Sequence, residues 1–248
     1  MLGYKCIIFD LDGTIYFGNN LADKANEVIK KSRSISDYIF FVTNNSAKTR
    51  QEIYERLVEM GIDVELNEVI TSSYAIGKYL KDNNIKSVYC IGTESLANEI
   101  KNNGIDINND FVETVVVGYN KDFKLDDLTE LLNSNISTKV SLIVANKERA
   151  YPTKNKMILG AAGPIVSAVE CVLNKQTDKI IGKPNKIMLD IVLKDLGLDP
   201  KEVCVIGDSL ESDVKMAQNY GADYIWITDS QTKEHRTIKK LEELLEIL

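Results

Sequence analysis

Short apolar runs alternate with segments of helical periodicity along the whole chain. The runs are of strand length and rich in β-branched and aromatic residues, which is typical of buried strands. The predicted strands are Cys6–Phe9, Tyr38–Val42, Ser87–Ile91, Thr114–Val117, Ser141–Ala145, Val203–Ile206 and Tyr224–Ile227.

The segments between these strands repeat apolar residues every three to four positions, as one face of a helix does. They comprise Leu21 to Ile29, Ile53 to Met60 before Gly61, and Ile187 to Leu196 before Gly197. The tail Ile238–Leu248, with leucines on one side, predicts a last helix.

This alternation predicts parallel βαβ units and therefore an α/β fold. In open α/β sheets, ligands bind outside the carboxyl ends of the strands. Three predicted strands end in short polar residues, namely Asp10 with Asp12, Thr43-Asn44-Asn45, and Gly207-Asp208-Ser209. We therefore expect these residues to form the site.

Composition narrows the class of protein. The chain has 248 residues, of which 44% are hydrophobic and 27% charged, as in globular proteins. Its net charge of −7 argues against a general nucleic-acid binder. No apolar run reaches the length of a membrane span, and Met1–Lys5 leads directly into the first strand. We expect no membrane association, no signal peptide and a cytoplasmic location.

The chain has few cysteine and histidine residues that could bind a metal or take part in catalysis. The four cysteines lack a CxxC spacing, so they indicate buried free thiols rather than a zinc or redox site. The single histidine, His235, lies in a polar stretch, which nearly excludes a Ser-His-Asp triad or a histidine-rich metal site. The chemistry must rest on carboxylates, hydroxyls, lysine and a hard metal.

Asp10 and Asp12 are the centre of the predicted chemistry. Residues at i and i+2 of a strand face the same side, and two such carboxylates repel each other unless a cation, a proton or a donor stabilises them. Asp10 is the candidate nucleophile, forming an acyl phosphate. Asp12 is the candidate general acid and then base.

Other residues can supply the positive charge that a phosphate ester needs. Asp208 and Asp213 offer oxygen ligands for Mg²⁺. Lys183, in Gly-Lys-Pro, could neutralise phosphoryl oxygens, and Thr43 with the backbone around Asn44 could donate to them. Each segment alone also suits a tight turn, a helix cap or an ordinary loop. Their occurrence together, in this order, favours function.

With these four motifs the chain resembles the haloacid dehalogenase superfamily of aspartate-nucleophile phosphatases. The matching positions are Asp10, Asp12, Gly13 and Thr14 in the first motif, Thr43 in the second, Lys183 in the third, and Gly207, Asp208 and Asp213 in the fourth. The long stretch between the second and third motifs resembles the cap insertion of the NagD-like, or nitrophenylphosphatase-like, branch.

The resemblance implies a Rossmann-like, doubly wound parallel sheet core with an inserted α/β cap domain. The core would comprise residues 1–72 and 182–248, and the cap residues 73–181. Asp10, Asp208 and the backbone carbonyl of Asp12 would hold Mg²⁺, with Asp213 supporting its waters. The cap would close over the phosphate pocket, as lids commonly do. Because branch relatives often pair through the cap, a homodimer is one expectation.

The resemblance leaves the substrate open among phosphoglycolate, nucleotide monophosphates, sugar phosphates, pyridoxal phosphate and aryl phosphates. The branch usually reads Thr-Asn-Pro-Asp in the cap, where this chain has Ala145-Asn146-Lys147-Glu148. Asn19–Asp23 lacks a glycine-alanine common in the branch, and Ser212 replaces a threonine. These departures affect the substrate rather than the reaction.

We expect a small-molecule phosphatase. A phosphoryl-transfer mutase on the same scaffold and a catalytically silent phosphometabolite-binding protein are the alternatives. A response-regulator receiver would be about half this length and would not need an acid at Asp12.

Overall fold

The computed structural model describes residues 3–108, 110–152, 157–158, 161–230 and 232–248. The chain divides into two compact units. The first comprises residues 1–43, 51–70 and 183–248, and the second comprises residues 44–50 and 71–182. The division into a core of residues 1–72 and 182–248 and a cap of residues 73–181 stays a prediction.

The first unit is built on a six-stranded sheet with the order β15-β14-β13-β1-β4-β5, in which the strands from β15 to β4 are parallel. Its strands are β1 (Cys6–Phe9), β4 (Tyr38–Thr43), β5 (Val69–Thr71), β13 (Val203–Gly207), β14 (Asp223–Ile227) and β15 (Thr237–Ile238). The central strand β1 pairs with β13 on one side and β4 on the other, and every residue of β1 is buried.

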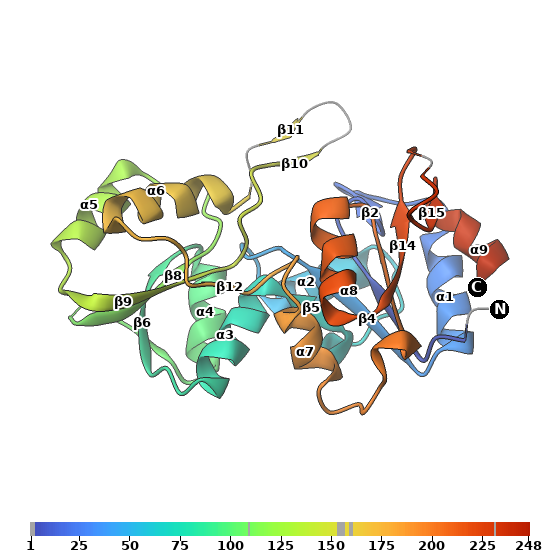
Figure 1. Ribbon diagram of the computed structural model, residues 1–248, viewed down its shortest axis with the longest axis horizontal. Coiled ribbons are helices and arrows are strands. Elements are labelled where there is room, and N and C mark those ends of the chain that lie inside the picture. Colours follow the sequence, from blue (N-terminus) through green and yellow to red (C-terminus); the bar gives the residue numbers. More distant parts are fainter. Residues whose placement is uncertain (1–2, 109, 153–156, 159–160, 231) are drawn as a thin grey trace. The chain divides into compact units, whose positions relative to one another are not determined.

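Helices cover both faces of this sheet, as the family resemblance implies. They are α1 (Ala25–Ile35), α2 (Arg50–Glu59), α7 (Ile187–Leu193), α8 (Lys215–Tyr220) and α9 (Leu244–Ile247). Figure 1 shows α1 and α9 on one side of the sheet and α8 on the other. Apolar residues of α1, α2 and α9 share one buried cluster with β1 and β4, including Val28, Leu57, Leu244, Phe9 and Phe41.

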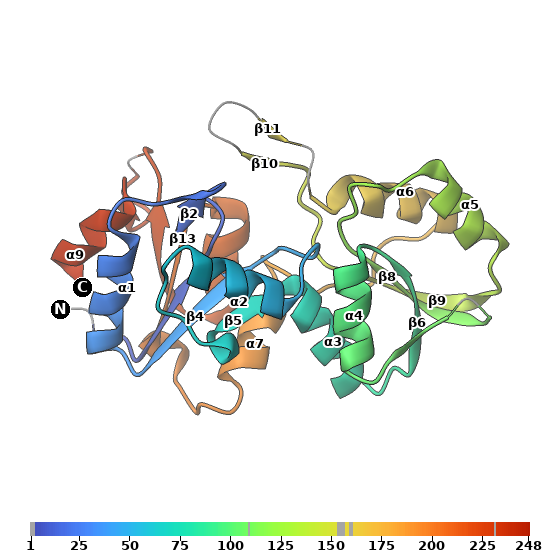
Figure 2. The same ribbon diagram turned by 180° about the vertical axis from the view of Figure 1, so that it is seen from behind.

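The second unit contains a five-stranded sheet with the order β12-β9-β8-β6-β7. The strands are β6 (Ser87–Ile91), β7 (Asp106–Ile107), β8 (Val112–Val117), β9 (Ile136–Val144) and β12 (Lys179–Ile180). Figures 1 and 2 show α3 (Ser72–Asp82) and α4 (Glu94–Asn102) on one face, and α5 (Leu125–Asn133) and α6 (Gly163–Leu173) on the other. This unit has its own apolar cluster, formed by β6, β8, β9, α5 and α6.

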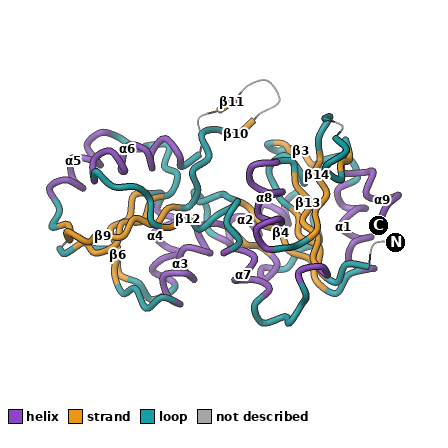
Figure 3. Tube along the Cα trace, viewed as in Figure 1, coloured by secondary structure: helices purple, strands orange, loops and turns teal. Residues whose placement is uncertain are grey.

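Short elements complete the fold, and the strand-and-loop view of Figure 3 makes them visible. β2 (Tyr16–Phe17) and β3 (Asn20–Leu21) form a hairpin after β1, and β10 (Tyr151–Pro152) pairs with β11 (Met157–Ile158). Single turns of 3₁₀ helix span Leu66–Glu68, Pro200–Glu202 and Leu241–Glu243, and a π-helical turn spans Leu210–Val214.

All seven predicted strands are present, but several helix predictions were wrong at their ends; α7, for example, ends at Leu193 rather than Leu196. Leu21 belongs to β3, because the hairpin pairs it with Tyr16. The tail is not one helix, because Ile238 pairs with Ile227 at the sheet edge and the chain then forms a 3₁₀ turn before α9.

The cysteine prediction was right in part. All four cysteines are free; Cys6 and Cys204 are buried, whereas Cys90 is half-buried and Cys171 is exposed on α6. The helix surface explains the last case, since α6 buries only the side that faces β8 and β9.

Candidate active site

The carboxyl ends of the central strands bring most of the predicted site residues together in the first unit. Asp10 follows β1, Thr43 ends β4, and Asp208 follows β13. The backbone amide of Asp10 still donates to Ile206 at 2.9 Å, so the sheet fixes where Asp10 leaves the strand. The parallel register of the strands therefore determines where these carboxylates lie, independently of the contacts that their side chains make.

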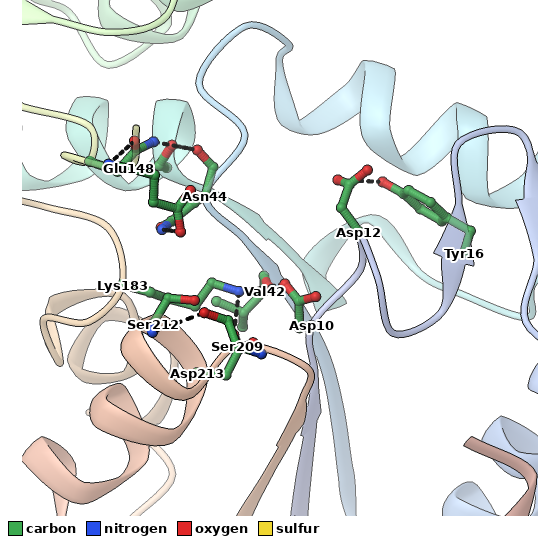
Figure 4. Close-up of polar contacts among 12 residues, drawn as sticks. Asp10, Asp12, Tyr16, Val42, Asn44, Glu148, Lys183, Ser209, Ser212 and Asp213 are labelled. Atoms are coloured by element: carbon green, nitrogen blue, oxygen red, sulfur yellow. Dashed lines mark hydrogen bonds and ion pairs between the residues drawn. The ribbon is translucent and has the colours of Figure 1, made fainter. Parts of the chain in front are cut away.

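Lys183 lies at the centre of this cluster (Figure 4). Its ammonium donates to Asp10 Oδ1 at 2.5 Å, to Asp213 Oδ1 at 2.6 Å and to the Val42 carbonyl at 3.2 Å. The side chain is only 3% exposed. The two carboxylates raise the pKa of Lys183 against the effect of burial, so the lysine is charged.

Two glycines make room for these carboxylates. Gly13 has a φ of +99°, which side chains rarely adopt, and a Cβ there would collide with the Asp208 carboxylate. A Cβ at Gly207 would collide with the side chain of Asp213. Larger residues at these two positions would displace the acidic groups themselves.

Asp10, Asp208 and Asp213 offer carboxylate oxygens within 4.8 Å of one another. Burial and mutual repulsion raise the pKa of Asp10, which Lys183 opposes, and burial with the charge of Asp213 raises the pKa of Asp208 to about 6. With all three carboxyl groups ionised, the cluster and the one ammonium carry a net charge of −2. A divalent cation would neutralise that charge.

One buried oxygen also fits a ligand at this place. Asp10 Oδ2 is buried without a hydrogen-bond partner among the residues the structure describes. Buried polar atoms normally have such a partner. The hard oxygen donors and this unmatched oxygen of Asp10 are suited to Mg²⁺ or a similar cation.

Asp12 lies apart from this cluster. Its carboxylate Oδ2 accepts a hydrogen bond of 3.2 Å from the hydroxyl of Tyr16, and Figure 4 shows it turned toward that ring. Part of Asp12 is exposed, yet the protein around the carboxyl raises its pKa, which the charge of Arg56 opposes.

Asn44 belongs to the second unit and makes its contacts there. Its side-chain amide donates to Glu148 Oε1 at 2.9 Å, and its carbonyl accepts from Ser72 and Asn146. Of the residues predicted to bind phosphate, Thr43 and Lys183 lie in the first unit. The phosphate-binding role of all three remains a prediction.

Sequence reasoning missed three residues that hold the site. Tyr16 donates to Asp12, Arg56 lies over the Tyr16 ring, and the indole of Trp226 donates to the backbone carbonyl of Asp208 at 2.9 Å. Only the spacing of Tyr16, four residues after Asp12, gave any signal.

Comparisons with known proteins decide the family. A model of haloacid dehalogenase-like hydrolases matches residues 7–106, and a second model of HAD-hydrolase-like proteins matches residues 180–244. The acid sugar phosphatase of Staphylococcus aureus is 33% identical over 229 residues, covering 92% of this chain and 87% of the relative. The chain belongs to the haloacid dehalogenase-like hydrolases.

Further relatives place this hydrolase in the NagD-like, nitrophenylphosphatase-like branch. The sugar-phosphatase AraL of Bacillus subtilis is 28% identical over 231 residues, covering 92% of this chain and 84% of the relative. The structure of a p-nitrophenyl phosphatase from Archaeoglobus fulgidus matches with a TM-score of 0.87 and 27% identity over 99% of both chains. The haloacid dehalogenase-like hydrolase described here is therefore a phosphatase.

No helix in the described part of this hydrolase is long and apolar enough to cross a membrane.

Proposed function

We propose that this chain is a Mg²⁺-dependent phosphatase of small phosphomonoesters that works through a phosphorylated Asp10. One observation carries the proposal: the buried Lys183 ammonium holds Asp10 at 2.5 Å beside Asp213 and within the acidic cluster. A lysine in that position fixes the carboxylate of Asp10 and adds the positive charge that an incoming phosphate dianion needs.

In this mechanism Asp10 forms the first bond. A carboxylate oxygen of Asp10 bonds to phosphorus while the bond from phosphorus to the ester oxygen breaks, and Asp12 gives its proton to that leaving oxygen. Asp12 then takes a proton from water, which attacks phosphorus and releases Asp10 and inorganic phosphate. Thr43, Lys183 and the backbone at Asn44 would hold the phosphoryl oxygens.

Asp10, Asp208 and the main-chain carbonyl of Asp12 would hold the cation, with Asp213 supporting its waters. When bound, Mg²⁺ supplies charge neutralisation at the phosphoryl oxygens. The protein residues orient the nucleophile and hold the proton, which are the remaining requirements for turnover.

Sugar phosphates are the substrates we favour, because two relatives that align with most of this chain are named sugar phosphatases. The second unit would act as the cap that selects among them. The partner is thus a small phosphate ester rather than a nucleic acid or a membrane. A homodimer through the cap stays a prediction, which light scattering of the purified protein would check.

The first experiment compares wild type with Asp10→Asn on p-nitrophenyl phosphate, with and without Mg²⁺. We expect metal-dependent release of p-nitrophenol that the variant loses, because an amide is a poor nucleophile. Asp195→Asn, an exposed change in the same unit, should keep wild-type activity. Normal turnover by Asp10→Asn would refute the aspartyl-phosphate mechanism.

A panel of sugar phosphates and other phosphomonoesters then tests the substrate class. Release of inorganic phosphate indicates hydrolysis, whereas transfer to a second hydroxyl of the sugar would indicate the mutase. Binding of a panel member without either product would indicate a silent binding protein.

A further inference from the structure

Asp12 makes its hydrogen bond with a tyrosine that the fold holds rigidly. Tyr16 is fully buried, and its hydroxyl donates to Asp12 Oδ2 at 3.2 Å. The ring belongs to the apolar cluster of the six-stranded sheet. A buried ring with only two side-chain torsions gives a hydroxyl that can occupy few positions.

The backbone around Tyr16 fixes this geometry further. The amides of Ile15 and Tyr16 both donate to the Leu11 carbonyl, at 2.9 and 3.1 Å, and the Gly13 amide donates to the Tyr16 carbonyl at 2.9 Å. Asp12 and Tyr16 therefore lie at two ends of one tight turn. The position of the carboxyl and that of its donor are set together.

Arg56, on α2, lies over the ring of Tyr16. Its guanidinium carbon lies 4.3 Å from the centre of the Tyr16 ring, and its Nη2 donates to the Gly18 carbonyl at 2.5 Å. Gly18 is in the turn of the hairpin that begins with Tyr16. The arginine thus links α2 to the hairpin. Its cation–π contact with Tyr16 further restricts the position of that ring.

We propose that Tyr16, supported by Arg56, is a positioning residue that fixes the Asp12 carboxyl and leaves its Oδ1 as the oxygen that holds the transferred proton. A hydroxyl that donates to Oδ2 occupies that oxygen as an acceptor, so the proton of the neutral carboxyl resides on Oδ1. The inference rests on the proposed role of Asp12 as general acid.

The choice of substrate separates this role from a structural one. p-Nitrophenolate is a stabilised anion that leaves with little help from an acid, whereas phenolate, with a pKa of about 10 like tyrosine, needs a proton more. The two phosphate esters have nearly the same shape. The ratio of kcat/KM for phenyl phosphate to kcat/KM for p-nitrophenyl phosphate therefore reports how well the proton is delivered.

We expect Tyr16→Phe to lower this ratio by roughly tenfold, the effect of losing one well-oriented hydrogen bond to a carboxyl. Tyr4→Phe is the matched control, because the Tyr4 hydroxyl also donates to an aspartate, Asp223 Oδ2 at 2.9 Å, in the same unit. That control should leave the ratio unchanged. Arg56→Met should lower the ratio in the same direction by a smaller factor.

Asp12→Asn separates failure of the inference from failure of the mechanism. If Asp12→Asn lowers the ratio and Tyr16→Phe leaves it within twofold of wild type, the positioning role is wrong and the acid role stands. If Asp12→Asn itself leaves the ratio unchanged, the acid role fails and the inference with it. Should Tyr16→Phe not fold, an unchanged ratio in Arg56→Met overturns the proposal.

Discussion

At the scale of single residues, the acidic cluster places three carboxylates against one lysine. Asp10, Asp208 and Asp213 repel one another in a buried place, and Lys183 compensates for only part of that charge. A site of this kind is strained by its own charge until a cation binds. The acidic cluster that would bind the metal therefore destabilises the metal-free protein.

This argument predicts opposite effects of Asp208→Asn with and without Mg²⁺. Wild type should gain several degrees in Tm at Mg²⁺ concentrations about 100-fold above Kd, because binding to the folded state alone contributes about 2.7 kcal/mol. Asp208→Asn should lose most of that gain. In EDTA, however, the variant should melt higher than wild type, because one repelling carboxylate is gone.

Thermal unfolding in EDTA and in Mg²⁺ measures both effects, with the exposed Asp195→Asn as control. A variant that keeps the full Mg²⁺ shift would show that Asp208 does not bind the cation.

The sequence could predict which residues meet here because parallel strands end at one edge of a sheet. Asp10, Thr43 and Asp208 each follow or end a strand that the apolar pattern identified. The contact between Arg56 and Tyr16 could not be predicted in the same way, since Arg56 comes from a helix 40 positions later and no local pattern pairs the two residues. Contacts that depend on tertiary packing produce no periodic pattern in the amino-acid sequence.

At the scale of elements, several hydrogen bonds connect residues 44–50 to the rest of the second unit. Asn44 contacts Glu148, Ser72 and Asn146, the Ser46 hydroxyl accepts from the Tyr119 amide, and the Arg50 amide donates to Glu99. The segment directly follows Thr43, a predicted phosphate ligand. The hydrogen bonds of this segment therefore affect the position of the end of β4.

We predict that Glu148→Ala loosens this segment and that Glu148→Gln does not. Alanine removes the acceptor of the Asn44 amide, whereas the glutamine carbonyl still offers one. The expected loss is about 1 kcal/mol of local stability, seen as several-fold faster amide exchange in residues 44–50 and a raised KM. Equal exchange in both variants would mean that Glu148 does not hold the segment.

The neighbouring Lys147, which departs from the usual sequence of the branch, is compensated within the same unit. Its ammonium pairs with both oxygens of Glu170, at 2.8 and 3.0 Å, and Thr177 donates its amide and hydroxyl to Glu170 Oε1 at 2.7 Å each. The positive charge of Lys147 is therefore partly neutralised by Glu170 of α6.

A pH dependence of stability follows from this contact. Burial alone would raise the pKa of Glu170, but the donors from Lys147 and Thr177 outweigh it and lower that pKa. A lowered pKa in the folded state contributes stability above the unfolded pKa of about 4.3, and that stability is lost as the pH falls through the folded value.

Glu170→Gln should therefore lower the free energy of unfolding by about 1 kcal/mol at neutral pH, a value that allows for solvent screening at the half-exposed lysine. The difference should shrink toward zero below about pH 4. Urea unfolding at pH 7 and pH 3.5 measures it, beside the exposed Glu113→Gln. A difference that stays constant over this range would rule out a contribution from the ionised carboxylate.

The strands differ in how well the sequence pattern predicts them, because some depend on tertiary contacts. The central strands were predicted to within a few residues because they are buried on both faces and contain apolar runs. The short strands β5 and β15 were not predicted, since two or three residues cannot display a period. They form because a neighbouring strand offers its unpaired edge.

At the scale of the whole molecule, each unit has a separate apolar core. The cluster on β1 and β4 contains residues of the first unit alone, and the cluster on β8 and β9 contains residues of the second alone. The chain nevertheless crosses between units four times, at 43/44, 50/51, 70/71 and 182/183. Composition could not predict this division, and the long insertion between the second and third motifs was its only sign.

Separate cores predict that each unit can be destabilised by itself. Leu142 in β9 and Leu57 in α2 are both fully buried, one in each core. Each change to alanine should cost about 2–5 kcal/mol in its own unit, because it removes buried methyl groups and leaves a cavity. Leu142→Ala should speed amide exchange in β6, β8 and β9 and leave β1 and β13 protected, and Leu57→Ala should do the reverse.

Hydrogen exchange followed by mass spectrometry resolves the two sheets, because their peptides do not overlap in sequence. The amides of the central strands exchange through the largest opening available to their unit. If Leu142→Ala speeds exchange equally in both sheets, the whole chain opens as one cooperative body. Exchange confined to the altered unit would instead show that the second unit can open while the acidic cluster at Asp10 stays assembled, as a cap that moves during turnover requires.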